Sequence, residues 1–185
     1  MKKPKYFTIE ELILKIDEPN RAGCRRIYSA NLKLFSEAAG SSHNHQNWPG
    51  GYLDHTGETM NIAVLLYDAL GAARHLPFSL SDALLILSLH DLEKPWKSVR
   101  RFADKEDRRK FREYKLGEYI IILTPAQENA LRYVEGEGDA YTNSHRVMNE
   151  LAAFCHMCDV WSARGWYAYP AAENDPWTGA KRSGE

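Results

Sequence analysis

Two histidines and two aspartates in this sequence have the chemistry of a metal site. They are His55 in "GGYLDHTGET", the adjacent pair His90 and Asp91 in "HDLEKPWK", and Asp159 in "CHMCDVWSAR". Imidazole suits transition metals, whereas carboxylates favour harder ions that accept six ligands. Asp91 also follows the apolar run "ALLILSL", where a dry and unpaired carboxylate costs several kcal/mol. A divalent cation held by these four side chains would offset that cost.

These side chains can converge only if the segments that carry them pack together. Apolar periodicity and capping signals predict helices over about 8–16, 22–38, 52–74, 124–134 and 143–167, and a charged helix over about 104–114. Another helix begins at Ser79 or Ser81 and is ended by Pro95. The segment 52–74 is nearly apolar all round from 62 to 73, which predicts a central position. The short apolar run 117–123 fits either a strand or a buried helix.

The predicted fold is an all-α, single-domain helical bundle. The chain has 185 residues, of which 44% are hydrophobic and 26% are charged, and this balance suits one soluble globular core. The helical domain is predicted to span 1–169, and 170–185 is predicted to be a loosely ordered tail because it lacks periodicity. The net charge of −1 directs the chain toward neither nucleic acid nor an anionic membrane. No apolar run is long enough to cross a bilayer and no signal core follows the N-terminus, so a cytoplasmic protein is expected.

The three cysteines predict no disulfide framework. Their odd number argues against a disulfide-stapled secreted domain. The stretch "CHMC" at 155–158 is similar to half of a zinc or redox pair, but the sequence contains no second pair. We interpret Cys155 and Cys158 as small core side chains.

The ordered set of His55, the His90–Asp91 pair and Asp159, on separate helices, resembles the HD-domain superfamily of metal-dependent phosphohydrolases. Members of that superfamily typically carry a lysine three residues after the aspartate of the pair, and Lys94 stands at that position in "HDLEK". The resemblance covers about residues 45–165. It implies an HD-type helical bundle in which the four side chains bind one divalent metal ion, with Mn, Mg, Fe, Co or Ni favoured over Zn.

The resemblance also implies hydrolysis of a phosphate ester by metal-activated water. Lys94 lies one helical turn beyond the His–Asp pair, so its ammonium could reach a non-bridging phosphate oxygen. Two glutamates compete for the proton-transfer role. Glu58 lies three residues after His55 on the same helical face, where it could orient the attacking water or support a ligand. Glu93 lies inside the motif, at a position where many relatives carry a small residue.

The loop that precedes His55, "SSHNHQNWPGGYLDH", is rich in side chains that can contact a substrate. Trp48 could stack on a base and Gln46 could read the base edge, with the glycine pair that follows them allowing close backbone approach. Two alternatives stay open. His43 and His45 could serve a second ion, or Trp48 could only cap the core of the domain.

Further candidates for substrate contact lie on other segments. His156 is one turn from Asp159 and could touch substrate or support a ligand. Lys97, with Arg100 and Arg101, could form an access path for phosphates. The basic run 108–110 is mixed with acidic residues and is predicted to be a solvated helix face.

The sequence therefore predicts a divalent-metal-dependent phosphohydrolase that acts on a nucleotide or another small phosphate ester. A nuclease acting on single-stranded nucleic acid is the nearest alternative, although nucleic acid is the less favoured partner because the chain has no net positive charge. A third alternative, from a different class, is a sensor module that binds a nucleotide without turnover. The subunit count stays open, and a homo-oligomer is compatible with the sequence.

Overall fold

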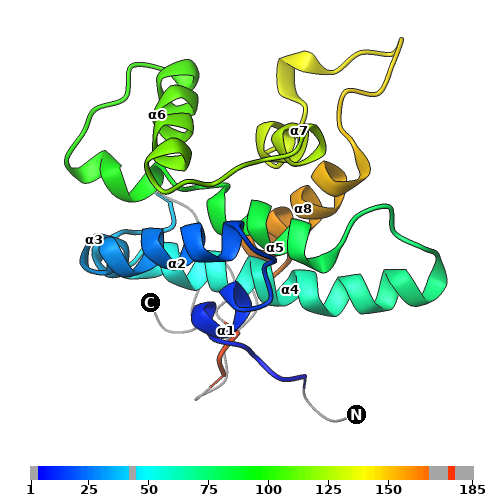
Figure 1. Cartoon of the computed structure of the whole chain (residues 1–185), viewed down its shortest axis with the longest axis horizontal. Coiled ribbons are helices and arrows are strands. Elements are labelled where there is room, and N and C mark those ends of the chain that lie inside the picture. The colour runs from blue at the N-terminus through cyan, green and yellow to red at the C-terminus, as the bar shows by residue number, and fades with distance from the viewer. Residues whose placement is uncertain (1–3, 42–44, 167–174, 178–185) are drawn as a thin grey trace.

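The computed structural model describes residues 4–41, 45–166 and 175–177. Every regular element within these residues is helical, so the predicted all-α class is confirmed (Figure 1). No helix in this described part is both long and apolar enough to cross a bilayer.

Most of the predicted tail, 170–185, lies outside the described residues. The α-helices are α1 (Ile9–Ile13), α2 (Asn20–Ala30), α3 (Leu32–Glu37), α4 (Gly51–Ala73), α5 (Leu80–Leu89), α6 (Lys105–Glu118), α7 (Pro125–Tyr133) and α8 (Glu150–Val160).

Three shorter helical segments complete the described elements. Two are 3₁₀ helices, η1 (Lys94–Ser98) and η2 (Gly138–Ala140), and the third, η3 (Trp161–Gly165), continues α8 as a π-helical turn. η1 contains the proline that the sequence predicts as the end of α5. The chain therefore leaves α5 in a tight turn directly after the His–Asp pair.

Predicted N-cap residues start three of the helices. In each case the cap hydroxyl accepts a hydrogen bond from the backbone N–H three residues later, and the side chain at that later position bonds back to the cap. Ser79, not Ser81, starts α5, because the Ser81 hydroxyl instead accepts a hydrogen bond from the backbone N–H of Asp17. The three pairs are Thr8 with Glu11, Ser79 with Asp82, and Thr124 with Gln127.

The core is built around α4, α5 and α8, which pack against one another near the centre of Figure 1. Every residue of α5 from 83 to 89 is buried, as its apolar sequence requires. α7 packs against α8, and α1 and α2 pack against α5. The last turn of α5, which carries His90, is therefore held inside the domain.

Burial along α4 differs from the predicted pattern. The apolar stretch 62–73 is expected to be central, but the structure buries 51–52 and 55–63 and leaves 68–73 exposed. The exposed end of α4 extends beyond the other helices at the right of Figure 1. Polar side chains in the buried half find partners in other segments: Asn61, for example, bonds both the N–H and the carbonyl of Phe7. Hydrogen bonds to other segments, and not hydropathy alone, thus determine which half of α4 is buried.

Three predicted segments have different limits in the structure. The predicted helix 22–38 is divided into α2 and α3 at Asn31, whose backbone leaves the helical region and whose side-chain amide donates to the carbonyl of Ile27. The charged helix predicted over 104–114 extends as α6 to Glu118. The run 117–123 is neither a strand nor a continuous helix, because it contains the end of α6 and a turn in which Ile120 has a φ of 58°.

The predicted helix 143–167 begins only at residue 150. Asn149 caps α8 by accepting a hydrogen bond from the backbone N–H of Ala152. Asn129 of α7 holds the preceding loop, since its amide donates to the Val147 carbonyl and its oxygen accepts from the Asn149 N–H. Contacts with α7 therefore compete with helix formation over 143–149.

The cysteines lie in the core. Cys24, Cys155 and Cys158 are free and buried. Burial raises the pKa of all three thiols, to about 11 for Cys24, so none of them is a thiolate at neutral pH. This supports the interpretation of "CHMC" as two core side chains.

Gly51 stands where the loop before α4 folds back on itself. A Cβ atom at position 51 would lie 1.9 Å from the carbonyl oxygen of Gln46. We therefore expect Gly51→Ala to lower the free energy of unfolding by more than about 2 kcal/mol, measured by urea denaturation, because backbone must move to relieve the overlap.

Gly71→Ala is the matched control for this effect. Gly71 lies near the other end of α4, and a Cβ added there would have no neighbouring atom within 4 Å. The alanine should leave stability unchanged or raise it by up to about 1 kcal/mol through helix propensity. A loss at Gly71 as large as at Gly51 would contradict the steric explanation.

Candidate metal centre

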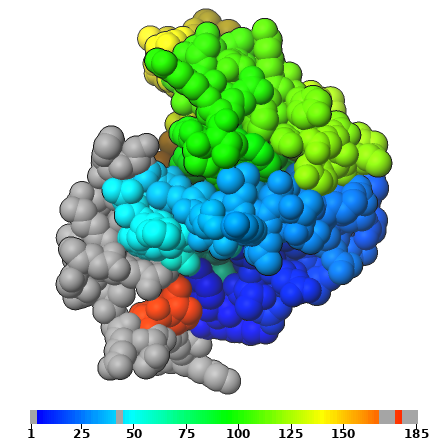
Figure 2. All heavy atoms as spheres, turned by 90° about the vertical axis from the view of Figure 1, so that its left-hand side faces the viewer, coloured from blue at the N-terminus to red at the C-terminus, as the bar shows by residue number. Residues whose placement is uncertain are grey.

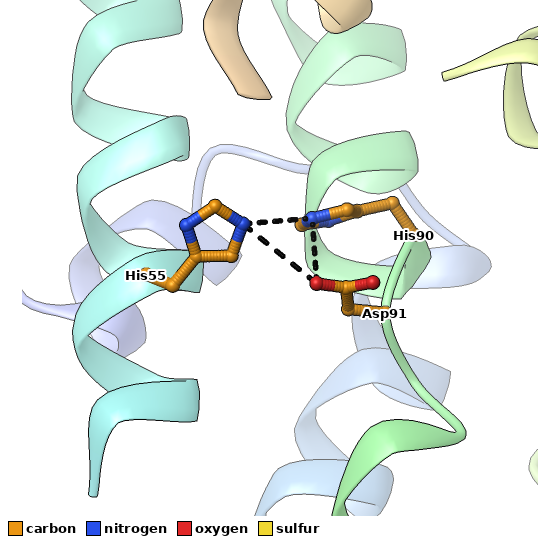
Figure 3. A group of neighbouring side chains, drawn as sticks. All are labelled: His55, His90 and Asp91. Atoms are coloured by element: carbon orange, nitrogen blue, oxygen red, sulfur yellow. Dashed lines mark hydrogen bonds and ion pairs between the residues drawn. The ribbon is translucent and has the colours of Figure 1, made fainter. Parts of the chain in front are cut away.

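Three helical segments bring the four predicted ligands together. His55 lies one turn into α4, His90 ends α5 with Asp91 directly after it, and Asp159 lies near the end of α8. Figure 3 shows the first three pointing toward one another. His55 Nε2 lies 3.3 Å from His90 Nε2, 3.7 Å from Asp91 Oδ2 and 3.0 Å from Asp159 Oδ1. His90 Nε2 lies 3.3 Å from Asp91 Oδ2 and 3.7 Å from Asp159 Oδ1.

These separations match those of atoms that share an ion. Around a cation with bonds of about 2.1 Å, neighbouring ligand atoms lie about 3.0 Å apart in an octahedron and about 3.4 Å apart in a tetrahedron. The five measured distances run from 3.0 to 3.7 Å. Two nitrogen and two oxygen donors also suit a divalent transition metal. His55, His90 and Asp91 therefore fit a divalent cation, and Asp159 lies beside the two imidazoles, within reach of the same position.

Hydrogen bonds on the far side of each imidazole turn its Nε2 toward the centre. His90 Nδ1 lies 2.7 Å from the carbonyl oxygen of Leu87, which can only accept, so Nδ1 carries a proton. His55 Nδ1 lies 3.1 Å from the hydroxyl oxygen of Ser162, which donates its own proton to Glu58 over 2.8 Å. Both Nε2 atoms are thereby aimed at the centre, in the orientation that metal-binding histidines adopt.

The charges of these groups favour a cation between them. Burial raises the pKa of the Asp91 and Asp159 carboxyls, but the neighbouring imidazoles outweigh burial, so both pKa values are lowered. Burial lowers the pKa of His55. At His90 burial also lowers the pKa, but the charge and hydrogen bond of Asp91 together with the charge of Asp159 outweigh it and raise the pKa to about 9. Metal binding competes with such a proton, because a ligating imidazole must be neutral.

Asp91 is a buried carboxylate with positive or polar groups on more than one side. Its side chain is 2% exposed, and its Oδ2 lies 3.3 Å from His90 Nε2. The same oxygen forms a close ion pair with Lys94. Burial lowers the pKa of Lys94, but the attraction of Asp91 outweighs burial and raises it, so the ammonium is charged beside the centre.

The two candidate glutamates have different surroundings. Glu58 is completely buried, and its carboxylate accepts hydrogen bonds from Gln46 and Ser162 at the back of His55. Glu93 is also buried, but its Oε2 accepts no hydrogen bond within the described residues and lies 3.7 Å from the guanidinium of Arg112. Burial raises the pKa of Glu93 despite this arginine. Glu93 also lines a groove between α6 and α7, so it is the glutamate on the open side.

The loop before α4 contacts the centre through His45. The His45 ring packs against His55 with ring centroids 4.7 Å apart, and neither of its nitrogens has a hydrogen-bond partner within the described residues. Burial lowers the pKa of His45 to about 4, so the ring is neutral at physiological pH. The role of His45 at an ion stays open, and His43 lies outside the described residues.

The polar groups of Gln46 and Trp48 bond to other residues of the chain. Gln46 is completely buried, and its amide donates to Glu58 and to Ser162. The Trp48 indole N–H donates to Asp54 over 2.7 Å. The structure therefore does not support the predicted contact of Gln46 with a base edge. Gln46 instead helps to hold the groups behind His55.

The structure does not bring His156 or Lys97 to the four-ligand centre. His156 Nδ1 lies 2.7 Å from the carbonyl oxygen of Val134, so this histidine ties α8 to the end of α7. Lys97 is exposed on η1. Contact of either residue with substrate remains a prediction.

Ser162 and Arg112 belong to the site, although the sequence did not identify them. Ser162 links His55 to Glu58, and its position three residues after Asp159 on one helical face was the available signal. Arg112 of α6 donates to the carbonyl oxygen of His90 and pairs with Glu93. No local pattern distinguishes Arg112 from the other arginines of α6, because its partners lie in another segment.

Comparisons of the chain with protein-family models, curated proteins and solved structures found no match. The likeness to the HD-domain superfamily therefore rests on the ordered tetrad and on Lys94.

We expect Ser162→Ala to weaken Mn²⁺ binding by about 10- to 100-fold, because His55 loses the group that holds its Nδ1 proton. Isothermal titration with Mn²⁺ measures this change. Ser98→Ala is the control, since the Ser98 hydroxyl donates to the Pro95 carbonyl in η1. Unchanged Mn²⁺ affinity in Ser162→Ala would show that His55 does not depend on this support.

Proposed function

We propose that this chain is a divalent-metal-dependent phosphohydrolase that acts on a nucleotide or another small phosphate ester. The observation that carries the proposal is the convergence of two imidazole nitrogens and two carboxylate oxygens beside a charged lysine. Lys94 stands beside the cation position with Asp91 between them, and a phosphate ester bound there would contact both positive charges. The buried Glu93 carboxyl on the groove side adds a proton-transfer group.

The chain's own residues position and stabilise the ester. A bound divalent cation would lower the pKa of a water molecule and neutralise a phosphoryl oxygen. The Lys94 ammonium, next to Asp91 Oδ2, donates to a non-bridging phosphate oxygen and offsets its charge. Ser162 and Glu58 hold the His55 ring in its orientation behind the centre.

Glu93 is the group that handles the proton of the leaving oxygen. Its Oε2 has no hydrogen-bond partner within the described residues and stands on the side where a ligand can approach. A proton held at Oε2 passes to the oxygen of the departing alcohol as the P–O bond breaks. Glu58 is excluded from this role by position, because Gln46 and Ser162 already bind its carboxylate.

An assay of the purified protein with Mn²⁺ tests the proposal. The substrates are p-nitrophenyl phosphate, a nucleoside monophosphate, a nucleoside triphosphate and a short single-stranded DNA, and EDTA-treated protein is the control. Metal-dependent release of phosphate or pyrophosphate is the expected result. No product with Mn²⁺, Mg²⁺, Fe²⁺, Co²⁺ or Ni²⁺ would contradict it.

The same panel separates the alternatives. Shortened oligonucleotides with no product from the mononucleotides would favour a nuclease. Tight nucleotide binding without product under any metal would favour a sensor module.

A further inference from the structure

A groove of about 950 Å³ lies between α6 and α7. This volume is near the upper end of the range for small-molecule sites, about 300–1,000 Å³. In Figure 1, α6 and α7 both stand above the layer that contains α2 and α4, and Figure 2 shows the green side chains around α6 rising above the blue and cyan side chains of that layer. Apolar side chains contribute to the lining, among them Leu116, Ile121 and Leu131.

The inner end of the groove reaches the metal centre. Glu93 and Glu135 line the groove, and their carboxylate oxygens lie within 4.8 Å of each other and of a carboxylate oxygen of Asp91. Arg112 also lines the groove and donates to the carbonyl oxygen of His90. A ligand at this end of the groove is therefore adjacent to the residues that hold the centre.

Basic and acidic side chains line the groove in equal number, but three of the basic ones have no ion-pair partner among the described residues. Arg109 is paired with Glu106 at 2.6 Å and with Glu113 at 2.7 Å. Lys105 and Arg108 of α6 and Arg132 of α7 also line the groove, and none of these three forms an ion pair within the described residues. The prediction that the basic run 108–110 is only a solvated helix face is therefore incomplete, because Arg108 and Arg109 line the groove.

Three basic side chains of α6 lie in a row along one face of the helix. Lys105, Arg108 and Arg112 are spaced by three and four residues, so they share one face of the helix. Seven residues span about 10 Å along a helix axis. The groove thus places cationic side chains well beyond the phosphate that Lys94 would contact, among an equal number of acidic ones.

We propose that this groove binds a second phosphate of the substrate, held between Arg108 and Arg132, and that the substrate class is a short phosphodiester such as a dinucleotide. The inference rests on the proposed function, because the first phosphate lies at the metal centre. Guanidinium groups bind phosphate oxygens through paired hydrogen bonds, and the apolar lining receives the sugar or base between the two phosphates. A single nucleotide leaves these arginines unused.

Binding of two probes without turnover tests the groove directly. Isothermal titration of the Mn²⁺-loaded protein compares non-hydrolysable phosphorothioate analogues of the 5′-phosphorylated dinucleotide pdTdT and of dTMP. We expect Arg108→Gln and Arg132→Gln each to weaken pdTdT binding by about tenfold, the loss of one charge-assisted hydrogen bond, and to leave dTMP binding unchanged. Unchanged pdTdT affinity in both variants, or equal weakening of both probes, would overturn the proposal.

Two matched variants sharpen the result. Lys110→Gln removes a positive charge from α6 outside the groove and should have no effect on pdTdT. Glu128→Gln removes a negative charge from the groove wall and should tighten pdTdT binding. Weakening by Lys110→Gln equal to that by Arg108→Gln would indicate only a general charge effect and would also overturn the proposal.

The activity assay distinguishes failure of the groove from failure of the proposed function. Hydrolysis of p-nitrophenyl phosphate together with arginine-independent pdTdT binding would remove the groove proposal and leave the phosphohydrolase. Arginine-dependent pdTdT binding with no hydrolysis of any ester would support the groove as a binding site and remove the catalytic function.

Discussion

Replacing Asp91 with alanine is expected to remove the bound metal and the phosphate-ester hydrolysis together. Asp91 Oδ2 lies within 3.7 Å of both imidazole Nε2 atoms, so its loss opens one side of the donor set. The substitution also leaves the partly buried Lys94 ammonium without its counter-charge, where it repels a cation. Metal content after dialysis, measured by mass spectrometry, and Mn²⁺-dependent phosphate release should both fall to the level of EDTA-treated wild type.

Two further variants separate loss of the metal from loss of the fold. Asp91→Asn keeps the shape of the side chain, removes its charge and should lose the metal in the same way. Asp68→Ala removes an exposed carboxylate from α4 and should keep both metal and activity. Full activity in metal-free Asp91→Ala protein would refute the metal mechanism.

Replacing Glu93 with glutamine should lower kcat by about 10²- to 10⁴-fold while the protein retains its metal. Glutamine preserves the size of the side chain but has no acidic proton to donate. The loss should be large for dTMP, whose alkoxide leaves poorly, and small for p-nitrophenyl phosphate, whose nitrophenolate departs without a proton. Comparing kcat for the two substrates, with metal content measured on the same samples, isolates the proton transfer.

Glu58→Gln is the natural comparison for this variant. Glu58 bonds to Ser162 behind His55, so its replacement should weaken Mn²⁺ binding and lower activity equally for both substrates. The same leaving-group dependence in both variants would contradict the assignment of separate roles. Loss of metal from Glu93→Gln would show that Glu93 serves the centre structurally.

Local chemistry made much of the helical framework predictable. A capping box depends on two residues three positions apart, which is why the starts of α1 and α7 could be placed at Thr8 and Thr124 before any tertiary contact was known. The four candidate ligands were also identified from the sequence, because Asp91 at the end of an apolar run is costly without a partner and the ordered set resembles that of the HD-domain superfamily. Helix ends that depend on distant contacts were misplaced: Asn129 of α7 keeps 143–149 out of α8.

The choice between the two glutamates required the tertiary structure. Both lie within three residues of a candidate ligand, and spacing gave no preference between them. Glu58 is directed to the back of the site by Ser162, which is 104 residues away in the chain. Glu93 is left without a hydrogen-bond partner among the described residues and faces the groove between α6 and α7.

The sequence by itself determined the all-α class, the starts of α1 and α7, and the identity of four side chains able to share a cation, because these depend on residue type and on short-range spacing. The tertiary structure decided that the four converge, that α4 buries its polar half, and that Arg112 reaches the carbonyl of His90. These features depend on which surfaces of distant helices meet. The hydrogen bond from Arg112 to His90 joins residues more than twenty positions apart, and such bonds produce no periodic pattern that could be recognised in the sequence.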